Sequence, residues 1–278
     1  MKVLITGAAG AIGNVLREGL QSNFSLLRLT DRTDIQSSRG SEEVIKADLT
    51  EFDTVCNLVE GMDAIVHLAG SLGVVRESGR IVGETSWTEI LDNNIKATYN
   101  VFEAARLCSV PRVVYASSIH AHGFYLRSHT VGVNDPPRPD SRYGLSKAFG
   151  ESTGRLYADK HGLQVVVLRI ATFKSRPTNV RELGTWISHR DMTELVKCSL
   201  NYPNPHFDIL WGVSANSRGI YQNPLAEKYK FFPQDNSEIY AKEILTDNLQ
   251  TPESPLESRF HAAHQASTGW SGNIDLID

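Results

Sequence analysis

The sequence has few cysteines and no close pair of them. Cys56, Cys108 and Cys198 are the only three in 278 residues, and none belongs to a Cys-x-x-Cys motif. Disulfide scaffolds and structural zinc sites need paired or clustered cysteines. The scarcity therefore argues against both, and it predicts a reducing, cytoplasmic location.

Long apolar runs and an excess of basic charge are also missing. No apolar stretch approaches the roughly 18 residues that a membrane helix needs, and the chain opens directly into a short apolar run, without the pattern of a secretory leader. Lys and Arg number 28 against 32 Asp and Glu, a formal net charge of −4. Dedicated nucleic-acid binders usually carry a basic excess. We therefore expect neither a membrane nor a nucleic-acid partner.

Short apolar runs alternate with helical patterns along most of the chain. This alternation is typical of a parallel sheet with helices on both faces. Strands are expected at 2–6, 24–31, 43–47, 63–68, 111–118, 163–170 and 206–214. Helices are expected at 14–23, 51–60, 87–109 and 143–161, and after Ser188.

A glycine-rich turn follows the first predicted strand and precedes the first predicted helix. Residues 7–13 read Gly-Ala-Ala-Gly-Ala-Ile-Gly. Gly7 permits a tight turn, Gly10 lets the backbone approach a pyrophosphate, and Gly13 lets the helix pack close to the sheet. The helix N-terminus adds free N–H groups and a positive dipole. In this strand–turn–helix context the motif predicts a dinucleotide site, formed by Gly7, Gly10, Ala11, Ile12 and Gly13.

Carboxylates at the ends of the second and third strands extend this predicted site. Asp31 lies near the expected spacing of about 20 residues from the glycine turn. A carboxylate there binds both ribose hydroxyls and repels a 2′-phosphate, which favours NAD over NADP; the alternative is a local turn cap. Arg32 weakens this preference because an arginine can receive a 2′-phosphate. Asp48 and Leu49 are placed to contact the adenine.

These patterns predict an α/β fold, a Rossmann-type doubly wound parallel sheet with a small carboxyl-terminal substrate-capping region. Residues 1–170 form the expected dinucleotide-binding core. Residues 171–278 form the expected capping region, which is not an independent domain. Its pattern is loose at 171–186 and from about 216 onward, and 250–278 reads as an irregular wrap or a mobile tail.

A tyrosine and a lysine four residues apart open the predicted helix at 143–161. This spacing places Tyr143 and Lys147 on one helix face. An ammonium near a phenol lowers the pKa of the phenol and makes it a usable base. Tyr-x-x-x-Lys is common on solvated helix faces, but Ser118, at the carboxyl end of a predicted strand, supplies a third partner where ligands bind in such sheets.

Two other groups of residues have open interpretations. The long insertion 71–86 follows a strand and borders the expected ligand crevice. Its Arg76 and Arg80 are either solvated or able to bind a phosphorylated substrate. The histidines at 120, 122 and 129 have no accompanying carboxylate cluster, so no metal site is predicted.

Together these motifs resemble the extended short-chain dehydrogenase/reductase family over about residues 1–215. The resemblance rests on the glycine motif, Asp31, the His-Leu-Ala-Gly at 67–70, Asn94, Ser118 and the Tyr143/Lys147 pair. It implies that Tyr143 is the base, Lys147 tunes it and holds the nicotinamide ribose, and Ser118 orients the reacting hydroxyl. It also implies cofactor contacts from Leu68, Ala69, Gly70, Asn94, Tyr143, Lys147 and Ile170.

Within that family, the chain resembles members that oxidise hexuronic acids. The specific matches are Ser-Ser-Ile-His at 117–120, the segment 181–191 with its Thr-Trp-Ile-Ser-His, and Trp-Gly-Val-Ser-Ala-Asn at 211–216. The resemblance assigns the substrate carboxylate to Arg181, whose fork suits a planar carboxylate; the alternative is a surface arginine. The substrate-binding set it implies is Ser71, Ser118, Ile119, His120, Tyr143, Thr172 and Arg181. Ile119 departs from the family, which has Asn at this position.

The expected activity is the NAD-dependent oxidation of galacturonate or glucuronate at the anomeric carbon to an aldarolactone. The alternatives within the family are a dehydrogenase of an aldose or sugar phosphate, and a nucleotide-sugar epimerase or dehydratase. A redox-sensing NAD-binding regulator is the alternative from another class, although it would not need a tuned phenol. The resemblance also implies a homo-oligomer that pairs through the helices at 87–109 and 143–161.

Overall fold

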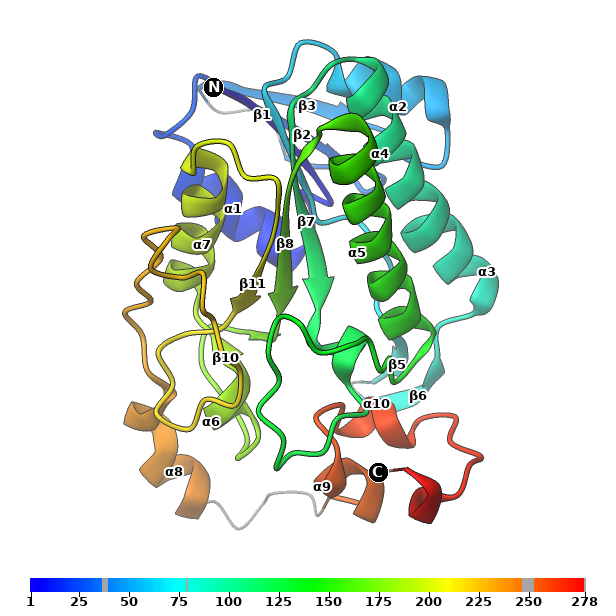
Figure 1. The fold of residues 1–278 in the computed structure, drawn as a ribbon, viewed down its shortest axis with the longest axis vertical. Helices are drawn as coiled ribbons and strands as arrows, with labels where there is room; N and C mark the ends of the chain where they lie inside the picture. The colour runs from blue at the N-terminus through cyan, green and yellow to red at the C-terminus, as the bar shows by residue number, and fades with distance from the viewer. Residues whose placement is uncertain (37–39, 79, 247–252, 278) are drawn as a thin grey trace.

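The computed structural model describes residues 1–36, 40–78, 80–246 and 253–277, and the side chain of Arg80 lies outside that description. A seven-stranded sheet of order β11-β8-β7-β4-β1-β2-β3 forms its centre (Figure 1). All neighbouring pairs are parallel, as predicted. The strands are β1 (Lys2–Thr6), β2 (Leu26–Asp31), β3 (Glu42–Lys46), β4 (Ala64–His67), β7 (Arg112–Ser118), β8 (Gln164–Ile170) and β11 (Phe207–Gly212).

The central strands are buried on both faces. Every residue of β4 and β7 is buried, and so is every residue of β8 after Gln164. Their near-continuous Val, Ile and Leu content is what a parallel sheet covered by helices on both sides requires. Because β11 pairs with β8, the sheet extends beyond Ile170 into the carboxyl-terminal part of the chain.

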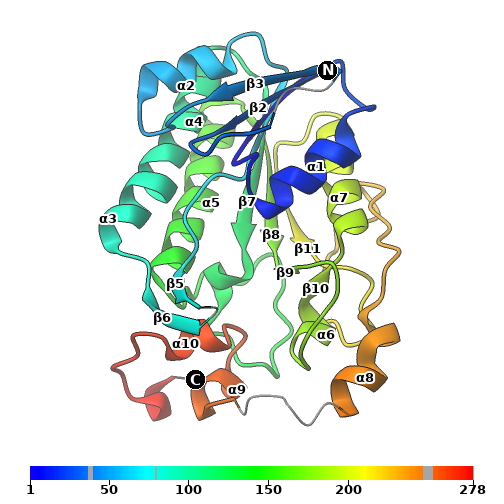
Figure 2. The same ribbon diagram turned by 180° about the vertical axis from the view of Figure 1, so that it is seen from behind.

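Two layers of helices cover the sheet. On one face, α1 (Ala11–Leu20) packs beside α7 (His189–Asn201); on the other lie α2 (Phe52–Val59), α4 (Ala97–Leu107) and α5 (Arg142–His161) (Figures 1 and 2). The predicted helix at 87–109 is α3 (Trp87–Ile90), a π-helical stretch (Leu91–Lys96) and α4 in succession. Ser188 caps α7 as predicted, with Oγ accepting from the backbone N–H of Asp191.

The short elements escape prediction because they are too brief to show periodicity. The insertion 71–86 contains the hairpin β5 (Val74–Glu77) and β6 (Arg80–Glu84). The expected loop at 171–186 contains β9 (Thr172–Phe173) and α6 (Glu182–Thr185), and β10 (Trp186–Ile187) pairs with β9. The later helices are α8 (Ala241–Thr246), α9 (Pro255–Arg259) and α10 (His264–Ser267), with 3₁₀ turns at Ile119–His122, Ser237–Tyr240 and Ile274–Leu276.

These short elements gather at the end of the molecule toward which the central strands point. In Figure 1, β7 and β8 run toward the hairpin β5–β6, α9 and α10. Residues 250–278 were expected to form an irregular wrap or a mobile tail. Within them, residues 253–277 are partly helical, and residues 250–252 and 278 lie outside the description. Among the described helices, none is both long and apolar enough to cross a membrane.

Candidate active site

The glycine turn adopts the conformation that the motif predicts. Gly7 has φ of +69°, and a Cβ atom there would lie 2.7 Å from the backbone nitrogen of Ala69. A Cβ atom on Gly13 would lie 2.6 Å from the carbonyl oxygen of Gly7, so α1 can approach the turn only because this position lacks a side chain. Gly10 is the N-cap of α1. The turn therefore leaves an open backbone cradle at a helix N-terminus.

A cleft beside this turn gathers most of the predicted cofactor residues. Thr30, Ala47, Thr50, Asn93 and Ala97 also line the cleft, although no sequence signal singled them out. The residue types fit a dinucleotide, with a glycine cradle for the phosphates, a carboxylate for the ribose and apolar side chains beside the adenine. The predicted residues among its lining are Gly7, Gly10, Asp31, Arg32, Asp48, Leu49, Leu68, Ala69 and Gly70.

Both carboxylates of the cleft hold neighbouring backbone. Asp31 Oδ2 accepts from the N–H of Ala9 at 3.1 Å, and its Oδ1 accepts from the N–H of Thr33 at 3.0 Å. Asp48 Oδ1 accepts from the N–H of Thr50 at 2.9 Å, and this bond lowers the pKa of Asp48. The contact with Thr33 is the local turn cap that was the alternative interpretation of Asp31. The same side chain also lines the cleft.

The remaining predicted cofactor residues are not among those that line this cleft. Ala11 is exposed at the start of α1, and Ile12 packs partly buried against the core. Ile170 ends β8 with 7% of its surface exposed. Asn94 is 2% exposed; its Oδ1 accepts from the N–H of Ser71, and its Nδ2 donates to Ser146 Oγ at 3.0 Å. Asn94 thus ties the end of the β4 loop to α5.

The structure brings Tyr143, Lys147 and Ser118 together. Lys147 Nζ lies 5.4 Å from the ring centroid of Tyr143 and donates to the carbonyl oxygen of Ala116 at 2.8 Å. A hydrogen bond links the side chains of Ser118 and Tyr143 and works to lower the pKa of the phenol. Ser141 begins α5 by accepting from the N–H of Gly144. That helix start positions Tyr143 facing the end of β7.

Burial sets the charge states of this triad. Desolvation raises the pKa of Tyr143 to about 12, although the hydrogen bond with Ser118 acts in the opposite direction. The expected lowering of the phenol's pKa is therefore not present in the protein alone. Desolvation also lowers the pKa of Lys147 to about 8, which leaves it protonated at neutral pH. The ammonium is a compact cation beside a phenol that must lose a proton to act as a base.

His120 lies next to the triad and is paired with a buried carboxylate. Its ring centroid is 5.9 Å from that of Tyr143, and its Nδ1 lies 2.6 Å from Asp140 Oδ2. The side chain of Asp140 is fully buried. No sequence signal pointed to Asp140, which stands in an irregular segment. The pair fixes the ring so that Nε2 faces away from Asp140.

The other predicted substrate residues have different surroundings. Ser71 Oγ donates to Glu89 Oε1 at 2.7 Å, and Glu89 was not predicted. Thr172 Oγ1 lies 2.9 Å from Thr185 Oγ1. Ile119 is 3% exposed and packs against a cluster that includes Trp211. Its side chain is thus part of the core, because the 3₁₀ turn after β7 directs it inward.

Arg181 is a half-buried cation without a carboxylate partner in the described part of the chain. Its Nε and Nη2 donate to the carbonyl oxygen of His261 at 3.0 and 2.7 Å. Desolvation lowers the pKa of Arg181, and the negative charge of Asp140 acts in the opposite direction. The charge of Asp140 also raises the pKa of Tyr143, so Arg181 and Tyr143 both lie within electrostatic range of the same buried carboxylate. Among the described residues this half-buried guanidinium donates to a neutral carbonyl and to no carboxylate, which suits it to an anionic ligand.

Of the two arginines in the insertion, the structure describes the side chain of Arg76 only. Arg76 is exposed on β5. Burial lowers the pKa of the half-buried His264 to about 4, and the charge of Arg76 acts in the same direction. The side chain of Arg80 lies outside the described residues. No contact from the carboxyl-terminal segment to the site was predicted from the sequence. In the structure, Arg181 donates to the carbonyl oxygen of His261, and the side chains of Gln265 and His120 are hydrogen-bonded. These contacts join residues 80 and 145 positions apart, so no local pattern could have revealed them.

Comparison with known proteins gives a consistent result. Residues 3–189 match the NAD dependent epimerase/dehydratase family. A uronate dehydrogenase of Pseudomonas syringae pv. tomato is 37% identical over 255 residues, which are 91% of this chain and 89% of the relative.

Solved structures agree with that match. A mutant uronate dehydrogenase of Agrobacterium tumefaciens complexed with NAD superposes with a TM-score of 0.88 at 34% identity, covering 96% of this chain and 97% of the other. A glucuronic acid dehydrogenase of Chromohalobacter salexigens gives a TM-score of 0.88 at 33% identity with the same coverage of both chains.

Proposed function

The chain belongs to the NAD-dependent epimerase/dehydratase family, and from this premise we propose that it is an NAD-dependent dehydrogenase of hexuronic acids. The reaction oxidises the anomeric carbon of the cyclic sugar acid and yields an aldarolactone and NADH. Relatives named uronate dehydrogenase that match nearly the whole chain support this assignment. One structural observation carries it: the guanidinium of Arg181 has no carboxylate partner among the described residues. It lies within electrostatic range of Asp140, which pairs with His120 beside the ring of Tyr143.

The cofactor is NAD, held in the cleft beside the glycine turn. Gly7, Gly10 and the N-terminus of α1 would hold the pyrophosphate, and Asp31 the adenosine ribose. Ala11, Ile12, Gly13, Asn94 and Ile170 complete the proposed cofactor set. When bound, NAD supplies the acceptor for the hydride that leaves the anomeric carbon.

Tyr143 is the proposed base of the reaction. Its phenolate oxygen takes the proton of the anomeric hydroxyl while the C–H bond of the same carbon gives up its hydride. Ser118, hydrogen-bonded to Tyr143, orients that hydroxyl. Burial raises the pKa of Tyr143 to about 12 in the protein alone. The ammonium of Lys147, 5.4 Å from the centroid of the ring, would stabilise the phenolate as it forms.

Arg181 is the proposed carboxylate-binding residue. A planar carboxylate accepts two parallel hydrogen bonds from a guanidinium, in a geometry that a neutral sugar cannot reproduce. Ser71, His120 and Thr172 are the proposed partners of the sugar hydroxyls, and at position 119 only the backbone would meet the substrate. This specificity for an acid distinguishes the proposal from an aldose dehydrogenase.

The setting of the enzyme is also part of the proposal. Three free cysteines support a cytoplasmic location. Exposed apolar residues on α4 and α5, among them Tyr99, Leu107 and Leu156, support pairing of two copies through these helices. Residues 171–278 serve as the substrate cap, while β11 and α7 within them complete the sheet and its covering.

The test is the formation of NADH, followed by absorbance, with NAD or NADP and a panel of uronic acids, neutral aldoses and sugar phosphates. The proposal predicts turnover with galacturonate or glucuronate and NAD. Turnover only with neutral or phosphorylated sugars would contradict the assignment of Arg181. Conversion of a nucleotide sugar without net consumption of NAD would instead support an epimerase. The similarity to uronate dehydrogenases does not favour that alternative.

A further inference from the structure

Gln265 comes from the carboxyl-terminal helix α10 and reaches the centre of the candidate active site. It is 7% exposed. Its Nε2 lies 3.1 Å from His120 Nε2, and its Oε1 lies 2.9 Å from Ser141 Oγ. A Cβ atom on Gly73 would lie 2.7 Å from both Gln265 Oε1 and Tyr143 Cβ. Gln265 and Tyr143 therefore flank the same stretch of backbone.

The pairing of His120 with Asp140 determines how Gln265 hydrogen-bonds. With its proton on Nδ1, toward the buried Asp140, the His120 ring presents Nε2 as an acceptor. One N–H of the Gln265 amide donates to it. The amide carries a second N–H, and Gln265 Nε2 makes no other hydrogen bond within the described part of the chain. This second donor is available to a ligand.

The acceptor end of the same amide is also available. Ser141 has a single hydroxyl proton, and its Oγ lies 2.6 Å from Asp140 Oδ1 as well as 2.9 Å from Gln265 Oε1. A carboxylate is the stronger acceptor of the two. When Ser141 donates to Asp140, Gln265 Oε1 is free to accept from a ligand. A free N–H beside a free carbonyl oxygen is complementary to a hydroxyl group, which both donates and accepts.

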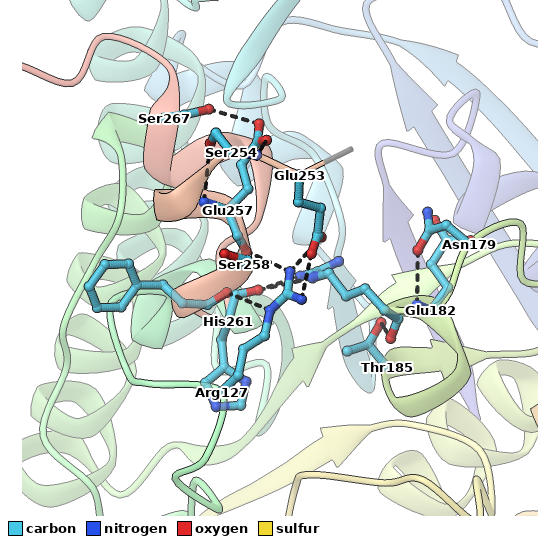
Figure 3. Close-up of polar contacts among 12 residues, drawn as sticks. Arg127, Asn179, Glu182, Thr185, Glu253, Ser254, Glu257, Ser258, His261 and Ser267 are labelled. Carbon is cyan, nitrogen blue, oxygen red and sulfur yellow. Dashed lines mark hydrogen bonds and ion pairs between the residues drawn. The ribbon is translucent and has the colours of Figure 1, made fainter. Parts of the chain in front are cut away.

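The segment that carries Gln265 is anchored on the loop that carries His120. Arg127 donates to both carboxylate oxygens of Glu253, at 2.7 and 2.6 Å, and to the carbonyl oxygens of Glu257 and Phe260 (Figure 3). The backbone N–H of His261 donates to Tyr125, and that of Ala262 donates to Gly123.

A second anchor holds the same segment. Figure 3 shows Arg127 and His261 side by side, with α6 nearby. Arg181, which immediately precedes α6, donates to the carbonyl oxygen of His261. The position of Gln265 relative to His120 is thus fixed by two arginines rather than by α10 alone, which has only four residues.

We propose that Gln265 is a substrate-binding residue that recognises a hydroxyl of the hexuronic acid, acting together with His120. This inference rests on the proposed function. Ile119, buried in the core, offers no side-chain polar group at this place, and Gln265 supplies one from the far end of the chain. The carboxyl-terminal segment therefore contributes to substrate specificity and also covers the active site.

The test compares Gln265→Leu with the wild-type chain in steady-state assays of NADH formation. Loss of a hydrogen bond between uncharged groups should raise KM for the hexuronic acid about threefold to tenfold. KM for NAD should stay within about twofold, because Gln265 does not line the cofactor cleft. Gln234→Leu is the matched control, since the Gln234 amide is exposed and donates to Phe232 within its own loop.

A panel of monodeoxy hexuronic acids separates recognition from a merely structural role. For the analogue that lacks the recognised hydroxyl, the wild type and Gln265→Leu should have the same KM. For every other analogue, KM should still be higher in Gln265→Leu than in the wild type. An equal KM ratio for all analogues would overturn the proposal. If Gln265→Leu does not fold, Gln265→Glu, which keeps the shape and removes both N–H donors, serves in the same panel.

The activity toward hexuronic acids and the role of Gln265 can be refuted separately. A wild-type chain that binds NAD but oxidises no hexuronic acid would refute the proposed function. An active wild type whose KM is unchanged by Gln265→Leu would refute only the role of Gln265.

Discussion

The guanidinium of Arg181 donates from both Nε and Nη2 to the carbonyl oxygen of His261, at 3.0 and 2.7 Å. This contact joins the candidate carboxylate site to the carboxyl-terminal segment. A carboxylate that binds Arg181 must share the guanidinium with His261 or displace the carbonyl. Substrate binding and the position of the segment are therefore coupled through one side chain.

Replacement of Arg181 tests the recognition of the acid. Arg181→Ala should raise KM for galacturonate or glucuronate about 10- to 150-fold, because a charged hydrogen bond contributes roughly 1.5–3 kcal/mol. Steady-state NADH kinetics measure the change. Arg176→Ala is the control, since Arg176 is exposed in the same loop and pairs with the exposed Glu243. An unchanged KM in Arg181→Ala would remove Arg181 from the substrate site.

Replacement of Tyr143 tests the proposed base. Tyr143→Phe should lower kcat at least about 100-fold, the lower range for general acid–base groups, because it removes only the phenolic oxygen. NAD binding, measured by calorimetry, should persist. Tyr99→Phe alters an exposed tyrosine on α4 and should leave kcat unchanged. Full activity of Tyr143→Phe would rule out the phenol as the base.

Replacement of Asp31 tests the choice of cofactor. The carboxylate repels a 2′-phosphate, so Asp31→Ser should lower the ratio of kcat/KM for NAD to that for NADP by about tenfold or more. Arg32, which also lines the cleft, can then receive the phosphate. The exposed Asp34, which pairs with Lys46, provides the matched control Asp34→Ser. If the ratio stays the same in Asp31→Ser, Asp31 serves only to hold the N–H groups of Ala9 and Thr33.

Buried histidines predict a loss of stability in acid. His67 is fully buried between the hydroxyls of Thr6 and Thr98, and burial lowers its pKa to about 3. An unfolded histidine has a pKa of about 6.5, so the unfolded state binds the extra proton between these values. The contribution of neutral, buried His67 to the free energy of unfolding is complete above pH 6.5. It declines as the pH falls toward 3, by up to about 1.4 kcal/mol per pH unit.

Urea denaturation between pH 7.5 and 5 measures this effect. His67→Asn should give a free energy of unfolding that depends less steeply on pH, by the equivalent of one proton. His122, His261 and His264, whose pKa values burial lowers to about 4, continue to contribute in that variant. Parallel pH curves for the wild type and His67→Asn would show that His67 is not buried in its neutral form.

The parts of the fold that could be predicted from sequence are those with local signals. Strands such as β7 and β8 are continuous apolar runs because helices cover both of their faces. The glycine turn could be predicted because Gly7 and Gly13 occupy positions where a Cβ would collide with backbone. Spacing alone placed Tyr143 and Lys147 on one helix face.

The rest of the site depends on contacts between distant segments. The hairpin β5–β6 escaped prediction because β5 shows no alternation of burial: Val74 is half-buried, and the strand is exposed from Val75 to Glu77. Asp140 and Gln265 meet at His120 from an irregular loop and a four-residue helix. Neither element has the length at which periodicity becomes visible.

The most direct test of the account follows the reacting carbon itself. Galacturonate labelled with ¹³C at C1 would be incubated with the enzyme and NAD, and the products followed by NMR together with NADH absorbance. We expect one NADH per sugar and conversion of the anomeric signal to that of a lactone carbonyl, with the C6 carboxylate unchanged. NADH formed while C1 keeps its anomeric signal, or no NADH from any hexuronic acid, would contradict it.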